Sequence, residues 1–285
     1  MSARTAKQNV QCATAEVPML MYHSIGTSAA RRFRRFAVHP AEFADQMAYL
    51  DDQGYQTVTA ADLAERQASV TSLPERPLVL TFDDAYEDFY TAALPVLREH
   101  GFRSTLFVPT AYVGMTAAFN ASTGEVDRRI MPWSAVRDVM AEGVEVGSHS
   151  HTHPQLDLVP GDILIEEISR SRKLLEDQLG VPIEGFAYPF GYWNRAARAA
   201  VADGGFRYAA AVADLRMSPG DDIFTLSRLT VRAGIGVTGL ARLVSRQSTL
   251  WRRGKARARL PFSRAVRGIV PVMGTSEIRE GPPGT

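Results

Sequence analysis

The chain has 285 residues, of which 45% are hydrophobic and 22% are charged, and its formal net charge is only +1. This composition is that of a globular protein with enough apolar residues for one large core, and it excludes a general attraction to nucleic acid or acidic membranes. Cys12 is the only cysteine. An intrachain disulfide and a zinc site built from several thiolates are therefore excluded, and any metal must be held by His and carboxylate side chains.

Short apolar segments alternate with amphipathic helical patterns from residue 17 onward, which predicts an α/β fold with a mainly parallel sheet. The predicted strands are Val17–Tyr22, Leu78–Phe82, Ser104–Val108, Val144–Gly147, Gly185–Tyr188 and Tyr208–Val212. The predicted helices, each ending close to a glycine, are Ala41–Asp52, Tyr86–His100 with a kink at Pro95, Trp133–Glu142 and Gly161–Leu179. We expect one domain at residues 16–248, between an N-terminal tail at 1–15 and a C-terminal tail at 249–285.

The alternation fades beyond about residue 237, and the segment Arg252–Arg267 is basic without one acidic residue. One interpretation of this tail is a solvated, partly disordered extension. The other is a surface that touches anionic lipid or an acidic partner, with Trp251, Leu260 and Phe262 as shallow apolar anchors. No apolar run is long enough for an export signal or a membrane span, so we expect a cytoplasmic protein, with peripheral contact at the inner membrane surface as a hypothesis.

Two adjacent carboxylates, Asp83 and Asp84, follow the apolar strand Leu78–Phe82. Adjacent carboxylates repel each other, and a divalent cation bound by one of them is the simplest compensation beside a buried strand. A solvated aspartate pair at the start of the next helix explains these two residues equally well, because carboxylates favour helix N-termini.

Three of the six histidines, His149, His151 and His153, lie directly after another predicted strand. His149 and His153 are four residues apart, so both rings can turn to one side of the chain and bind one ion. Pro154 disfavours helical geometry at His153, which predicts a turn there, and the intermediate spacing of His151 directs its ring elsewhere. Two His and one Asp leave open positions on a zinc-like ion, and this arrangement is typical of a catalytic site that activates water.

Two further strand ends carry unusual residues. Tyr188, Pro189, Phe190 and Gly191 follow one apolar run, and His23 follows the first strand. Because ligands bind at the carboxyl ends of parallel strands, we expect these residues to share one site with the aspartates and histidines. For Phe190, packing in the core is as good an interpretation as contact with a ligand. For His23, a structural role as a hydrogen-bonded imidazole is slightly favoured over a role as general acid.

The sequence resembles the polysaccharide deacetylase family, the NodB homology domain, over most of its length. Thr81–Asp84 resembles the first family motif, Gly147–Pro154 the second and Phe186–Gly191 the third. The resemblance implies a single-domain distorted (β/α) barrel. It also implies one divalent metal ion, zinc first with cobalt, nickel or manganese as alternatives. The residues that it assigns are Asp83 as the general base and Asp84, His149 and His153 as metal ligands.

The chain departs from the family pattern at two places. The third motif lacks the arginine that orients the catalytic base in the family, and Arg228 is the predicted substitute. A Leu-x-His sequence near the C-terminus, which often supplies the general acid, is also missing. Of the histidines that are not proposed ligands, only His23 ends a core strand, so we predict that His23 protonates the leaving amine.

The sequence therefore predicts a metal-dependent hydrolase that removes N-acetyl groups from an amino-sugar-containing glycan or a lipid-linked glycan precursor. Nucleic acid is not an expected partner. Two alternatives stay open, namely hydrolysis of a small cyclic amide or imide on the same fold, and a non-catalytic carbohydrate-binding protein. The predicted substrate contacts are Tyr188, Pro189, Phe190 and Gly191.

Overall fold

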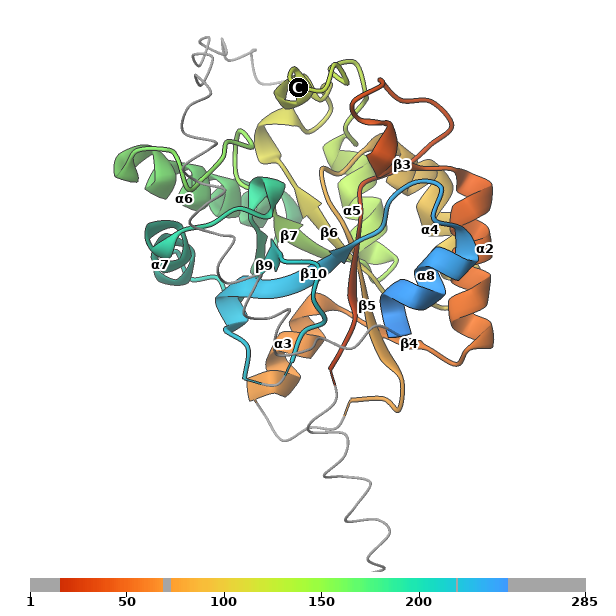
Figure 1. Ribbon diagram of the computed structural model, residues 1–285. Coiled ribbons are helices and arrows are strands. Elements are labelled where there is room, and N and C mark those ends of the chain that lie inside the picture. The colour runs from red at the N-terminus through yellow and green to blue at the C-terminus, as the bar shows by residue number, and fades with distance from the viewer. Residues whose placement is uncertain (1–15, 69–72, 219, 246–285) are drawn as a thin grey trace, which may run out of the picture.

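A computed structural model describes residues 16–68, 73–218 and 220–245 (Figure 1). Parallel strands form a closed ring, because β1 pairs with both β5 and β10. Around the ring the order is β1 (Met19–Tyr22), β10 (Leu226–Thr230), β9 (Tyr208–Val212), β8 (Gly185–Ala187), β7 (Glu145–Ser148), β6 (Thr105–Val108) and β5 (Pro77–Phe82). The ring confirms the predicted (β/α) barrel.

Helices surround this barrel, as Figure 1 shows. They are α2 (Pro40–Asp52), α3 (Ala60–Ala68), α4 (Leu94–Glu99), α5 (Trp133–Ala141), α6 (Gly161–Leu179), α7 (Arg195–Asp203) and α8 (Gly236–Ser245). Three short strands complete the sheets: β4 (Gln56–Val58) pairs with the beginning of β5, and β2 (Ser24–Ile25) pairs with β3 (Ala37–Val38). The six predicted strands correspond to β1 and β5–β9, whereas β2, β3, β4, β10, α3, α7 and α8 were not predicted.

The barrel strands read as continuous apolar runs because both of their faces are buried. Side chains alternate along each strand: Leu20 and Leu80 pack outward into a cluster that includes α2, and Met19 and Val79 pack into a second cluster. That second cluster collects side chains from strands all around the ring, including Phe107 of β6, so it fills the barrel interior. With the interior filled, a ligand can reach only the ends of the strands.

One predicted helix differs from its expected form. We expected Tyr86–His100 as a helix kinked at Pro95, but a wider, π-type turn at Phe89–Ala93 precedes α4. Pro95 lies in the first turn of α4 and has no N–H to donate, and the wider turn directly before it is where the regular α-helical pattern is interrupted. The other three predicted helices correspond to α2, α5 and α6, and the glycine that ends α6, Gly180, has a left-handed φ of 69°.

The basic segment Arg252–Arg267, for which we predicted contact with a membrane surface, lies outside the described residues. Among the described helices, none is long and apolar enough to cross a membrane.

Candidate active site

The two aspartates of the first motif stand at the end of β5. The N–H of Asp83 donates to the carbonyl of Tyr22 at 3.0 Å, which ties this end to β1. Both aspartates are only 3% exposed. The backbone at Asp84 is left-handed, with φ of 74°, so the chain turns sharply between the two carboxylates and each meets different partners.

The predicted metal ligands meet at one point. Nε2 of His149, directly after β7, lies 3.5 Å from Oδ1 of Asp84, and Nε2 of His153 lies 3.3 Å from the same oxygen. One ligand atom from each of the three residues lies within 4.8 Å of the other two, and all three residues are buried. The structure therefore brings Asp84, His149 and His153 together, although they come from two separate segments.

This donor set fits a divalent metal ion. Nδ1 of His149 lies 2.8 Å from the carbonyl of Ala187, which can only accept, so Nδ1 carries the proton and Nε2 keeps its lone pair. Burial lowers the pKa of His149 to about 4, which keeps the ring neutral. Oδ1 of Asp84 is buried and has no hydrogen-bond partner among the described residues, a costly arrangement that a cation would complete.

The other oxygen of Asp84 is held by a buried hydrogen-bond chain that the sequence did not reveal. The hydroxyl of Tyr86 donates to Oδ2 of Asp84 at 2.7 Å, and Nδ2 of Asn120 donates to the hydroxyl of Tyr86 at 2.6 Å. This chain fixes the carboxylate so that its free oxygen, Oδ1, faces the two imidazoles.

The turn between the two histidines is organised by Glu167 of α6. Its carboxylate accepts the N–H of His151 at 2.9 Å and the N–H of Thr152 at 2.7 Å. The ring of His151 bonds to the hydroxyl of Thr110 at 2.8 Å and lies outside the triad. The spacing argument thus placed His151 correctly, whereas Glu167, eighteen residues beyond His149, gave no local signal.

Arg228 of β10 holds the second carboxylate. Its Nη1 and Nη2 donate to Oδ1 and Oδ2 of Asp83 at 2.6 and 2.9 Å, and its side chain is fully buried. The guanidinium also lies 5.5 Å from the ring centroid of Phe107 inside the barrel. Burial by itself would raise the pKa of Asp83, but the charge of Arg228 and its hydrogen bonds to the carboxylate hold that pKa below its ordinary value.

His23, just beyond β1, lies near both carboxylates. Its ring packs on Phe36 with centroids 4.7 Å apart, and Nδ1 is buried with no hydrogen-bond partner in the described part of the chain. Burial lowers the pKa of His23, and the charges of Asp84 and Asp83 partly oppose this effect. The structure thus places His23 where the sequence predicted it, at the same strand-end site.

Aromatic rings border His153. The ring centroids of Phe119 and Phe190 lie 4.4 and 4.9 Å from that of His153. The side chain of Phe190 is 44% exposed and can touch a ligand from solvent. Phe119 was not predicted, because its segment follows no helix or strand pattern.

The third motif does not contribute all the predicted substrate contacts. Tyr188 is fully buried and its hydroxyl donates to the carbonyl of Phe224 at 3.0 Å, so the prediction of substrate contact through its side chain is wrong. Pro189 and Gly191 are also buried. Gly191 has φ of 72°, and a Cβ there would lie 2.4 Å from the side chain of Val212, so only glycine fits this turn.

The motif loops hold strained backbone. Most of the described non-glycine residues with left-handed φ lie in these loops, and they are Asp84, Ala85, Ser150, His153 and Phe190. Each such residue costs on the order of 1–3 kcal/mol and persists only where its surroundings fix it. At His153 the fixing contact is local, because its N–H donates to the hydroxyl of Ser150 at 3.0 Å. The backbone is therefore set in its site geometry before any ligand arrives.

Comparisons with known proteins show which family the chain resembles. The family model for polysaccharide deacetylase matches residues 71–209. The protein YxkH of Bacillus subtilis (strain 168) is 25% identical over 221 residues, which are 78% of this chain and 73% of that protein. The poly-beta-1,6-N-acetyl-D-glucosamine N-deacetylase of Escherichia coli (strain K12) is 32% identical over 135 residues, 46% of this chain but only 20% of that protein.

A solved structure matches the barrel. The Streptococcus pyogenes deacetylase PplD in complex with acetate has a TM-score of 0.70 at 21% identity, and the match covers 81% of this chain and 99% of that one. The parallel barrel gathers carboxylates and imidazoles at its strand ends, an arrangement that can hold a catalytic metal ion. The chain is similar to the polysaccharide deacetylase family, whose model covers just under half of it. The family match contains the three motifs, whereas His23 and Arg228 lie outside it.

Proposed function

We propose that the chain is a divalent-metal-dependent N-deacetylase that hydrolyses the acetamido groups of amino sugars in a glycan. The observation that carries this proposal is the buried cluster of Asp84, His149 and His153 beside a second carboxylate, Asp83, whose orientation Arg228 fixes. The name of the Escherichia coli relative supports an N-acetylglucosamine polymer or a smaller precursor of one as the substrate class.

Asp84, His149 and His153 would hold the metal ion. Two imidazole nitrogens and one carboxylate oxygen suit zinc, with cobalt, nickel or manganese as alternatives. When bound, the ion would supply Lewis-acid polarisation of the acetamide carbonyl and of a water molecule.

The remaining residues move protons and hold the substrate. Asp83 accepts a proton from the attacking water, whose oxygen bonds to the acetamide carbon, and Arg228 keeps Asp83 ionised for this task. Asp83 passes that proton to His23, the leaving nitrogen takes it from His23 as the C–N bond breaks, and acetate and a free amine are released. The exposed ring of Phe190 contacts the sugar.

Acetate release from β-1,6-linked N-acetylglucosamine oligomers tests the proposal. We expect turnover by the zinc-loaded protein, loss of turnover after chelation, and loss in Asp83→Asn. Asp222→Asn is the matched control, because Asp222 forms a surface ion pair with Arg198 and should keep full turnover.

The alternatives give different results in the same assay. Turnover of small cyclic imides without acetate release from any oligomer would assign the alternative chemistry. Oligomer binding by the metal-loaded protein without turnover of either substrate would indicate a carbohydrate-binding protein.

A further inference from the structure

An arginine-rich segment lies close to the proposed site and outside the residues that match the family model. We call the side chains of Arg31, Arg32, Arg34 and Arg35 the rim arginines. All four are exposed, and within the described residues none of them forms an ion pair. Because the whole chain has a net charge of only +1, the rim arginines are a local concentration of positive charge.

The segment is held rigidly against the site. Phe33, between the rim arginines, is only 2% exposed and packs on Tyr86 with ring centroids 5.6 Å apart. Tyr86 in turn donates to the proposed metal ligand Asp84. The N–H of Arg34 bonds to the carbonyl of Ala30 at 2.9 Å. A single buried ring thus separates the backbone of the rim arginines from the residue that holds Asp84.

A second route of contact leads to His23. The guanidinium carbon of Arg35 lies 4.6 Å from the ring centroid of Phe36, which packs on His23. The carbonyl of Arg35 accepts the N–H of Ala233 at 3.0 Å, which brings another exposed arginine, Arg232, next to the same segment. In Figure 1 this part of the chain, beside β3, lies at the same end of the barrel as the tips of β5 and β6.

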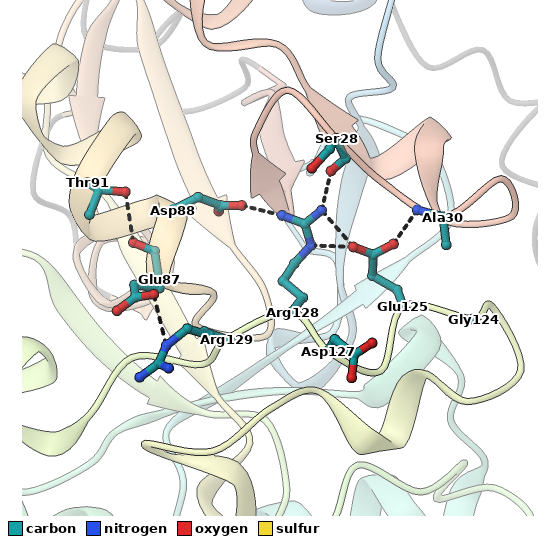
Figure 2. Close-up of a pocket in the computed structure, with 10 residues that line it drawn as sticks. All are labelled: Ser28, Ala30, Glu87, Asp88, Thr91, Gly124, Glu125, Asp127, Arg128 and Arg129. Atoms are coloured by element: carbon teal, nitrogen blue, oxygen red, sulfur yellow. Dashed lines mark hydrogen bonds and ion pairs between the residues drawn. The ribbon is translucent and has the colours of Figure 1, made fainter.

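The nearby carboxylates do not neutralise the rim arginines. A pocket of about 470 Å³ lies beside the segment and is lined in part by Ser28 and Ala30. In this pocket Arg128 already pairs with Asp88 and Glu125 (Figure 2). The other oxygen of Glu125 accepts the N–H of Ala30. Asp127 also lines this cavity, but one carboxylate cannot balance four guanidinium groups. The acids beside the segment hold its backbone in place and leave its positive charges available.

We propose that the rim arginines bind an anionic group, a phosphate or a carboxylate, on the sugar next to the N-acetylated residue that enters the site. This proposal rests on the proposed deacetylase function and narrows its substrate to an anionic glycan. Guanidinium groups match the oxygens of both anions through paired, charge-assisted hydrogen bonds. Clustered guanidinium groups repel one another, and a bound anion removes that repulsion.

The test compares kcat/KM for three N-acetylglucosamine oligomers: one neutral, one bearing a carboxylate and one bearing a phosphate. We expect a preference of about tenfold or more for an anionic oligomer at low salt, and a decline of that preference as ionic strength rises. Whichever anionic oligomer is preferred identifies the source of the charge. Replacing all four rim arginines by glutamine abolishes the preference. The matched control, which keeps it, replaces four exposed arginines on outer helices, Arg137, Arg170, Arg195 and Arg242.

The preference ratio separates this proposal from deacetylation itself, because a general loss of activity lowers both kcat/KM values together. An unchanged ratio in the rim variant, or a wild-type preference for the neutral oligomer, overturns the proposal. If no oligomer is hydrolysed, the proposed function fails, and calorimetric binding of the same oligomers still decides about the anion site. Binding to phosphatidylglycerol vesicles that depends on the rim arginines, without any oligomer preference, would assign them to a membrane surface and overturn the proposal.

Discussion

Arg228 holds Asp83 through two parallel hydrogen bonds, although the two residues lie 145 positions apart in the sequence. Both side chains are buried, so water cannot solvate either charge if the other residue is removed. Removing one member of such a buried pair typically costs about 3–5 kcal/mol, because the other charge stays buried and unpaired. The same ion pair therefore stabilises the barrel and keeps the proposed base, Asp83, ionised.

Replacing Arg228 by methionine should raise the pKa of Asp83, because burial then acts without an opposing cation. Since Asp83 can accept a proton only when it is ionised, the acid limb of the kcat/KM–pH profile should move to higher pH. We expect kcat/KM at pH 7 to fall about 10²-fold or more. A profile whose acid limb stays in place would contradict the proposed role of the pair.

The pair between Asp83 and Arg228 should also make the free energy of unfolding depend on pH in a predictable direction. The folded-state pKa of Asp83 is below its ordinary value, so its contribution to stability is complete above the unfolded-state pKa and is lost as the pH falls through the folded-state value. Urea unfolding at several pH values should show this loss in the wild type. The double variant Arg228→Met with Asp83→Asn should recover stability relative to Arg228→Met alone while staying inactive.

Replacing Tyr86 by phenylalanine should weaken metal binding about 10–100-fold, because Asp84 loses the hydrogen bond that fixes its carboxylate. Tyr22→Phe is the matched control, since it removes a buried hydroxyl that donates to Gln46 at 2.9 Å. Both variants should lose on the order of 1 kcal/mol of stability. Competition with a chromophoric chelator should show weaker metal binding for Tyr86→Phe but not for Tyr22→Phe. Equal metal affinities of the two variants would contradict the role of Tyr86 in positioning Asp84.

Removing the metal should lower the melting temperature as well as the activity, because the buried Oδ1 of Asp84 loses its proposed cation. Free zinc at about 100 times its dissociation constant should stabilise the fold by roughly 2.7 kcal/mol. Thermal unfolding with chelator and with zinc measures this difference. Asp84→Asn should unfold at the same temperature under both conditions, and a zinc response that survives in this variant would place the ion elsewhere.

Replacing His23 by glutamine should reduce kcat by about 10²–10⁴-fold while the metal content stays unchanged. Because burial lowers the pKa of His23, its ring is neutral at pH 7, and the proton that it donates is the one that Asp83 has taken from the attacking water. His100→Gln, which removes a surface partner of Asp51, is the control. Full turnover in His23→Gln would exclude it as the acid.

The sequence predicted those parts of the site that occupy continuous segments after apolar strands. Asp83 and Asp84 follow an unbroken apolar run, and His149 and His153 follow another, so the rule that strand ends share one edge was enough to group them. The strand that carries Arg228 was missed even though Arg228 itself was chosen. Its residues, Leu226–Thr230, include a buried serine and a buried arginine, which do not read as an apolar run. The burial of Arg228 becomes tolerable only through its ion pair with Asp83, directly after β5.

The contacts around Asp84 could not be predicted, because they depend on tertiary structure. Asn120 and Phe119 lie in a segment between β6 and α5 without helical or strand periodicity, and their roles come from where that segment folds back. The helices α7 and α8 were missed for a different reason. The buried face of α7 is little more than Ala197 and Val201, too narrow for a clear apolar pattern.

The ring closes only when β10 inserts between β9 and β1. During synthesis, a nascent chain that ends before this strand already contains both aspartates and the two proposed histidine ligands of the metal, but it lacks the guanidinium that pairs with Asp83. Under the proposed mechanism such a chain cannot hydrolyse acetylated sugars. Hydrolysis therefore begins only after β10 has closed the barrel and placed Arg228 beside Asp83.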